Sequence, residues 1–231
     1  MTTKTDLSLP SYADVRKRIE NVEDPEIQFC LKTTYLYAGR ISEVVGKASP
    51  GDSKTTARGP KGTDVLLDYY QFRDKEEEVA VFTVRTAKRG GIERKVGIPT
   101  SFEPWAKQLY EYFQDHKDSY VFPFTRQTVW VRSKDVFKGF IYFIEDYRVL
   151  RNAELELVQR HLRLFRLHAL RHLRASELVS FYGFDGFGLA TYGGWKYSTA
   201  ARTSAVIDRY LSLSWQSYIE KLFKPRMIGE R

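Results

Sequence analysis

Apolar side chains recur every three or four residues over most of this chain, which is the spacing that places them on one face of an α-helix. This spacing predicts helices over residues 11–22, 25–38, 40–46, 103–116, 133–147, from 166 onward and over 198–211. Asp24 before Pro25 marks a strong helix start, because Asp caps free backbone amides and Pro suits the first turn. Residues 152–165 fit either one further helix or a helix with a connecting loop.

Three shorter runs, 64–73, 79–85 and 94–99, are rich in Val, Tyr, Phe and Ile and have the character of strands. A charged turn at 74–78 and a glycine-containing turn at 86–93 separate them, which predicts antiparallel pairing. We therefore expect a mainly α-helical fold with one small three-stranded antiparallel sheet.

Composition and charge narrow the class of protein. The 231 residues are 42% hydrophobic, enough for a sizeable core, and the net charge of +8 favours a polyanionic partner, nucleic acid first. The single cysteine, Cys30, cannot form an internal disulfide, and no apolar run is long enough to span a bilayer. We expect a cytoplasmic protein that does not bind a membrane.

One helix places His168 and Arg171 three residues apart, so the two side chains share a face. Arg binds a phosphate as a planar fork, and His transfers protons near neutral pH. Such pairs are also common on solvent-exposed helix edges, and the pair alone decides nothing. Two further motifs follow it: Gly-Gly-Trp at 193–195 and Asp-Arg-Tyr-Leu at 208–211.

This order of motifs resembles the C-terminal half of the catalytic domain of the tyrosine recombinase (phage integrase) family. In that family a His-x-x-Arg helix, a Gly-His or Gly-Trp step and a nucleophilic Tyr follow one another. Arg40 after Gly39, with Glu43 three positions on, resembles the first signature box of the family. A plain surface ion pair is the alternative for Arg40 and Glu43. The interval from Trp195 to Tyr210 is longer than the family usually shows.

The turn at 86–93 resembles the β-hairpin that carries the catalytic lysine of this family. Lys88 matches that lysine best, and Arg89 and Lys95 are alternatives because the hairpin is a few residues longer than usual. A solubilising hairpin tip without a catalytic role is the remaining interpretation.

Cleaving a phosphodiester with a protein hydroxyl requires a nucleophile, cations on the non-bridging oxygens, a base and an acid. The candidates are Tyr210 as nucleophile, Arg40 and Arg171 as cations, His168 as base and Lys88 as acid.

Supporting roles go to three more residues. Trp195 has one indole N–H, which suits a phosphate oxygen or packing of the segment that bears the nucleophile. Glu43 and His172 are expected to support the catalytic groups. A phosphotyrosyl bond conserves the energy of the broken bond, so no nucleotide cofactor is expected. No metal is expected either, because no His, Cys, Asp and Glu cluster has ligand spacing.

The region offers four tyrosines, and we assign the nucleophile to Tyr210. Tyr192 precedes the Gly-Gly-Trp step, and Tyr197 follows Trp195 too closely. Tyr218 belongs to a C-terminal packing or partner-exchange segment with the apolar residues Leu213, Trp215, Ile219, Leu222 and Phe223.

Basic residues outside the catalytic set are expected to contact DNA phosphates. One group lies in a basic loop over 48–63, one in the turn at 86–93, and one in or before the predicted helix 133–147, which corresponds to a major-groove helix of the family. These residues are Lys54, Arg58, Lys61, Arg89, Arg126, Arg132, Lys134 and Lys138.

The resemblance covers residues 24–211 and implies a catalytic domain, preceded by an extension (1–23) and followed by the C-terminal segment (212–231). Family members usually carry an N-terminal DNA-binding domain, for which 1–23 is too short, so the chain is either truncated or a minimal member. The implied function is that of a site-specific recombinase or integrase that cleaves and rejoins double-stranded DNA through a 3′-phosphotyrosyl intermediate. Four copies are expected to assemble on the DNA in a synapse, and the expected location is the nucleoid or a host cytoplasm. Alternatives are a type IB topoisomerase-like enzyme or telomere resolvase, and a DNA-binding module that has lost catalysis.

Overall fold

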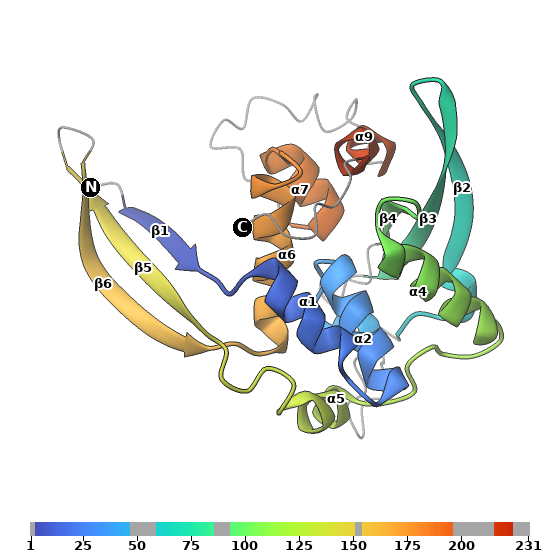
Figure 1. The fold of residues 1–231 in the computed structure, drawn as a ribbon, viewed down its shortest axis with the longest axis horizontal. Helices are drawn as coiled ribbons and strands as arrows, with labels where there is room; N and C mark the ends of the chain where they lie inside the picture. Colours follow the sequence, from blue (N-terminus) through green and yellow to red (C-terminus); the bar gives the residue numbers. More distant parts are fainter. Residues whose placement is uncertain (1–2, 47–58, 86–92, 151–153, 196–214, 224–231) are drawn as a thin grey trace.

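Helix α2 (Pro25–Leu36) lies at the centre of the molecule (Figure 1). The computed structural model describes residues 3–46, 59–85, 93–150, 154–195 and 215–223. As predicted, Pro25 opens α2, and the Asp24 side chain accepts a hydrogen bond from the Ile27 amide at 3.3 Å. Every side chain from Cys30 to Leu36 is buried, because other helices surround α2. Its neighbours are α1 (Tyr12–Glu20), α3 (Ile41–Val44), α4 (Pro104–Asp115), α5 (Arg126–Ser133) and α6 (Leu167–Ser180).

The predicted three-stranded antiparallel sheet is confirmed. Strands β2 (Val65–Phe72), β3 (Lys75–Arg85) and β4 (Glu93–Pro99) pair in that order. The expected turn over 74–78 is wrong, because Phe72 pairs with Lys75 and leaves a two-residue turn. Arg73 takes a positive φ of 55°, which such a tight turn requires. A helix of the expected 40–46 region is present as the short α3, after which Gly46 has a φ of 77°.

A second antiparallel sheet replaces two of the predicted helices. Its strands are β1 (Thr3–Ser8), β5 (Ile141–Val149) and β6 (Leu155–Leu164), in the order β1-β5-β6. The predicted helix over 133–147 is therefore wrong: α5 ends at Ser133, residues 134–139 form turns, and strand β5 begins at Ile141. The predicted helix within 152–165 is also wrong, because this segment is mostly strand. Aromatic and branched residues crowd 141–147, and such side chains fit a pleated surface better than a helix. Eight α-helices and two sheets make the described chain mixed α/β rather than mainly α.

Two elements near the C-terminus pack on β4. These are the 3-10 helix η2 (Trp215–Ser217) and α9 (Ile219–Leu222). Trp215 and Tyr218 are buried there, and Gly97 makes room for the indole, because a Cβ at Gly97 would lie 2.6 Å from it. The helix predicted over 198–211 lies outside the described residues. Among the described residues no helix has both the length and the apolar character that crossing a membrane requires.

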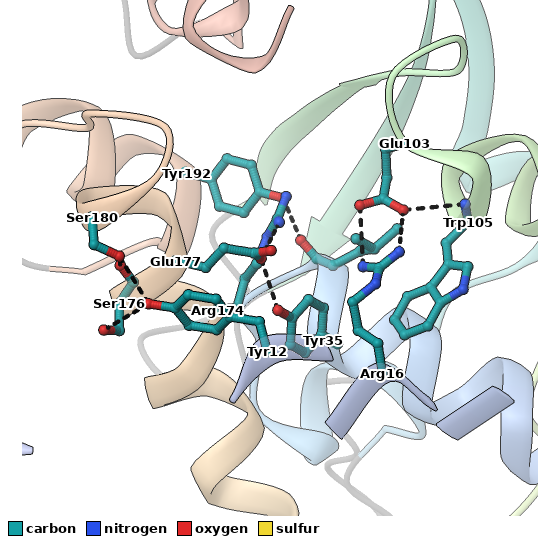
Figure 2. Close-up of polar contacts among 11 residues, drawn as sticks. Tyr12, Arg16, Tyr35, Glu103, Trp105, Arg174, Ser176, Glu177, Ser180 and Tyr192 are labelled. Atoms are coloured by element: carbon teal, nitrogen blue, oxygen red, sulfur yellow. Dashed lines mark hydrogen bonds and ion pairs between the residues drawn. The ribbon is translucent and has the colours of Figure 1, made fainter. Parts of the chain in front are cut away.

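A buried polar network fixes α6 against α2 (Figure 2). Arg174 of α6 donates to Glu177 at 2.6 Å, and Tyr35 of α2 donates to the same carboxylate at 2.7 Å. Arg174 also donates to the Tyr192 hydroxyl at 3.2 Å, and Tyr192 donates to the Leu36 carbonyl. Because these groups have almost no solvent contact, the bonds hold α6 in one rotation, with Arg171 turned inward.

Candidate phosphate-binding site

Glu43 is the carboxylate around which the site is built. It lies in α3, and its side chain is only 1% exposed. Its oxygens accept hydrogen bonds at 3.2 Å from the Arg40 backbone amide and from the Arg40 guanidinium. Gly39 allows this approach, because a Cβ there would lie 3.2 Å from Glu43 Oε2. The predicted Gly39, Arg40 and Glu43 motif is therefore one local structure at the start of a helix.

Three guanidinium groups from separate parts of the chain face Glu43. Nitrogens of Arg40, Arg94 and Arg171 lie 3.2, 3.5 and 3.9 Å from its carboxylate oxygens. Arg40 precedes α3, Arg94 lies in β4 and Arg171 lies in α6. One negative charge thus faces three positive charges, two of them on almost fully buried side chains. Burial and the nearby Arg40 and Arg94, partly opposed by Glu43, lower the pKa of Arg171 to about 10.

Three buried guanidinium nitrogens lack a hydrogen-bond partner within the described parts of the chain. They are Nη1 of Arg94 and Nη1 of Arg171 at this site, and Nε of Arg174 in the network that holds α6. Nε and Nη2 of Arg94 donate to the Tyr192 and Tyr37 carbonyls at 2.9 Å each, and Nη2 of Arg171 donates to the Gly193 carbonyl at 3.2 Å. Unpaired buried donors are costly, and the oxygens of an anion would satisfy them. The site is therefore electropositive and pre-formed.

Trp195 covers Arg171. The guanidinium carbon of Arg171 lies 4.2 Å from the centre of the Trp195 ring, a cation–π arrangement that orients the arginine. Helix α7 (Gly186–Gly193) ends immediately before this tryptophan, and Gly194 takes the left-handed conformation with φ of 64°. Gly193 is required because any Cβ there would collide with the Trp195 ring. The structure thus explains why both positions before Trp195 are glycine.

His168 and His172 lie beside the arginines on α6. Their rings are perpendicular with centroids 4.8 Å apart. Partial burial and the charges of Arg171 and Arg40 lower the pKa of His168, and burial with His168 and Arg171 lowers the pKa of His172. Both imidazoles are therefore neutral near pH 7. A neutral His168 can accept a proton.

The structure brings six of the predicted site residues into this one cluster. They are Arg40, Glu43, His168, Arg171, His172 and Trp195. Six predicted or alternative positions lie outside the described residues: Lys54, Arg58, Lys88, Arg89, Tyr197 and Tyr210. Lys95 is exposed on the face of β4 opposite Arg94, because successive strand residues point to opposite faces.

Two tyrosines weighed as nucleophiles are locked in the interior. Tyr192 is fully buried, and its hydroxyl bridges Arg174 and the Leu36 carbonyl. Tyr218 is 1% exposed, and its hydroxyl accepts from the Gly97 amide at 3.1 Å. Burial raises the pKa of both phenols. Neither hydroxyl is placed to attack a bound phosphate.

The predicted DNA-contacting residues that the structure describes have different surroundings. Arg132 is paired with Asp24 and Glu26, so its charge is neutralised at the start of α2. Arg126 is exposed at the start of α5. The Lys61 ammonium lies 5.8 Å from the Tyr120 ring centre. Lys134 and Lys138 line a cavity of about 250 Å³ that Arg166 also lines.

A second cavity, of about 400 Å³, opens beside His168. Its lining is mostly basic and apolar: Tyr142, Leu162, Arg163, Leu164, Arg166, His168 and Ala169. Arg166 thus borders both cavities, and basic groups extend from the arginine cluster toward α5. No role was predicted from the sequence for Arg94, Arg163 or Arg166. The signal for Arg94 was present, since it occupies the same face of β4 as the buried Val96.

No family model, curated protein or solved structure matches this chain. The site must therefore be interpreted from its own chemistry. Among the described residues no group of three His, Cys, Asp or Glu side chains is placed to hold a metal ion. What these residues provide is a set of fixed guanidinium donors, a neutral imidazole and an indole, which is suited to an oxyanion.

Proposed function

We propose that this chain breaks and rejoins DNA strands through a phosphotyrosyl intermediate, as a site-specific recombinase or integrase of the tyrosine recombinase type. The observation that carries the proposal is the convergence of Arg40, Arg94 and Arg171 on Glu43, where the buried Nη1 atoms of Arg94 and Arg171 have no hydrogen-bond partner among the described residues. His168 and Trp195 border the same place.

The proposed substrate group is a DNA phosphodiester. Its non-bridging oxygens bind Arg40, Arg94 and Arg171, and Glu43 holds these guanidinium groups in position. Charge builds on those oxygens as phosphorus becomes pentacoordinate, and donors fixed beforehand stabilise that state without reorganising. Trp195 orients Arg171 through its ring face.

The proposed reaction involves two proton transfers, one from the attacking phenol and one to the departing sugar oxygen. The phenol oxygen of Tyr210 bonds to phosphorus, and neutral His168 accepts the phenolic proton. The bond between phosphorus and the 5′ sugar oxygen breaks, and that oxygen takes a proton from Lys88. The 3′-phosphotyrosyl bond keeps the energy of the broken bond, and a 5′ hydroxyl reverses the step.

The proposed partner is double-stranded DNA in the nucleoid or a host cytoplasm, with self-association on the DNA. The net charge of +8 supports a polyanionic partner. Lys134, Lys138 and Arg166 extend the basic surface beside the site. A type IB topoisomerase-like enzyme or telomere resolvase would use the same residues and differ in the fate of the cut strand.

Incubation with supercoiled plasmid tests the proposal. We expect relaxation and protein covalently attached to a 3′ phosphate, with both lost in Arg171→Ala. Arg18→Ala is the matched control, because Arg18 is an exposed arginine of α1, and it should retain both. Gel retardation without any covalent product would leave only a DNA-binding module and contradict the proposal.

A further inference from the structure

The β1-β5-β6 sheet extends from the helical body, with β6 at its outer edge (Figure 1). Nine of the ten side chains of β6 are exposed, and His161 is half-buried. Among the described strands β6 pairs only with β5, so its second edge presents free backbone amides and carbonyls.

One face of this sheet is largely apolar. The strand register places Ile141 beside Leu164, Phe143 beside Leu162, and Tyr147 beside Leu157. Side chains alternate along strands, and these pairs share a face on either side of a bulge at Val158. The ion pair of Glu145 with Arg160 crosses the same face.

Exposed apolar residues are concentrated on this sheet. Of the thirteen large hydrophobic side chains that are exposed among the described residues, eight lie on the sheet or beside its β5–β6 connection. They are Leu7, Ile141, Leu150, Leu155, Leu157, Val158, Leu162 and Leu164. A concentration of this kind marks a surface that another molecule covers.

The charge of the sheet does not fit DNA. Its three strands contain four acidic residues and four Lys or Arg residues, although the whole chain has a net charge of +8. The excess positive charge therefore lies elsewhere. A balanced, apolar sheet is suited to a protein partner.

Strand β6 is a long edge strand. It is ten residues long and contains no proline, glycine or lysine, although it has one bulge and three charged side chains. The bulge at Val158 leaves two regular segments, Leu155–Leu157 and Gln159–Leu164. The first segment and the last three residues of the second complement each other when one is reversed: Leu155 opposes Leu164, Glu156 opposes Arg163, and Leu157 opposes Leu162.

We propose that β6 pairs antiparallel with β6 of a second copy of this chain. The two sheets then form one six-stranded sheet, in which the apolar pairs of the two copies lie on the same face and are separated by the Glu145–Arg160 ion pairs. Because the two copies are related by a two-fold axis, each contact occurs twice. The pairing therefore contains two Glu156–Arg163 ion pairs and four leucine pairs, two of Leu155 with Leu164 and two of Leu157 with Leu162. This contact involves no DNA and does not depend on the proposed function.

Sedimentation of the full chain without DNA tests the pairing. We expect a monomer–dimer equilibrium that Leu157→Lys shifts to monomer. Leu66→Lys is the matched control, because Leu66 is 47% exposed on the other sheet and Leu157 is 50% exposed. The control should dimerise like the parent chain.

Charge reversal tests the register and does not depend on the leucine variant folding. Like charges directly across strands destabilise the pairing, so Glu156→Arg and Arg163→Glu should each raise the dimer Kd by about tenfold. The double variant exchanges the charges and should lower Kd relative to both single variants, although the Arg148–Glu156 ion pair within each chain is lost. A chain that stays monomeric, or a dimer unaffected by Leu157→Lys, would overturn the proposal. Failure of the double variant to restore dimers would overturn the pairing.

Discussion

Glu43 is the residue on which the electrostatics of the candidate site depend. One buried carboxylate cannot neutralise Arg40, Arg94 and Arg171 together. The pKa of Arg171 is lowered chiefly by burial and to a smaller extent by the charges of Arg40 and Arg94. Buried surplus charge costs stability, so its presence points to a ligand of opposite charge. Arg171 is the arginine of this set that also contacts Trp195.

Arg171→Ala should abolish DNA cleavage while leaving DNA binding largely intact. One lost phosphate contact among many costs little in the ground state, but the same contact is needed as charge builds in the transition state. Parallel measurement of adduct formation and of gel retardation checks this. Equal losses in the two assays would point to a structural role for Arg171.

The free energy of unfolding should fall as pH is lowered through the ordinary histidine pKa of 6.5. His168 and His172 have lowered pKa values in the folded chain, so the unfolded chain binds protons more readily below that pH. The stabilisation is complete above pH 6.5 and is lost as pH falls toward the folded values. Urea unfolding at several pH values measures it, and the double change His168→Gln with His172→Gln should flatten the curve. An unchanged slope in that variant would contradict the assignment.

At the scale of elements, sequence signals that are local predicted several helix and strand positions correctly, whereas strand pairing between distant segments was not predicted. Asp24 and Pro25 correctly predicted the start of α2. The segments that form β2, β3 and β4 lie close together in sequence and were predicted as strands. The pairing of β5 with the consecutive strand β6 is local, and there the helical spacing of apolar residues was followed although aromatic and branched residues favoured a strand. Strand β5 also pairs with the distant β1 near the N-terminus, which nothing near Ile141 signals. The same limit applies to the site: His168 and Arg171 share a helix, whereas Arg94 reaches Glu43 only through the tertiary fold.

The link between α6, α7 and α2 gives a stability prediction. Tyr192→Phe removes the hydroxyl between Arg174 and the Leu36 carbonyl and leaves both without this partner in the interior. We expect a loss of about 1–3 kcal/mol in the free energy of unfolding. Tyr69→Phe on exposed β2 is the control and should change stability by less than about 0.5 kcal/mol. Equal stability of the two variants would show that the network does not hold α6.

At the scale of the whole molecule, the apolar sheet and the basic site differ in charge and adjoin at one end of β6. The β1-β5-β6 sheet has balanced charge, whereas basic residues of the helical body and Arg163 at the end of β6 line the cavities beside the arginine site. The proposed functions of these regions are accordingly distinct, with DNA on the body and a second copy on the sheet.

DNA affinity should therefore fall steeply with salt. Each phosphate neutralised adds about 0.9 to the slope of log K against log salt. Fluorescence anisotropy of labelled duplex between roughly 50 and 200 mM salt measures that slope. An affinity that stays flat over this range would exclude a phosphate-dominated contact.

Trapping on a suicide DNA substrate, with the attached residue identified, tests the central claim most directly. Tyr192 and Tyr218 are buried and hydrogen-bonded, which leaves Tyr197 and Tyr210 of the four tyrosines considered. We predict that Tyr210→Phe eliminates the covalent adduct, while Tyr197→Phe and Tyr218→Phe retain it. An adduct that persists in Tyr210→Phe and disappears in Tyr197→Phe would move the nucleophile, and an adduct that no single change removes would contradict the recombinase mechanism.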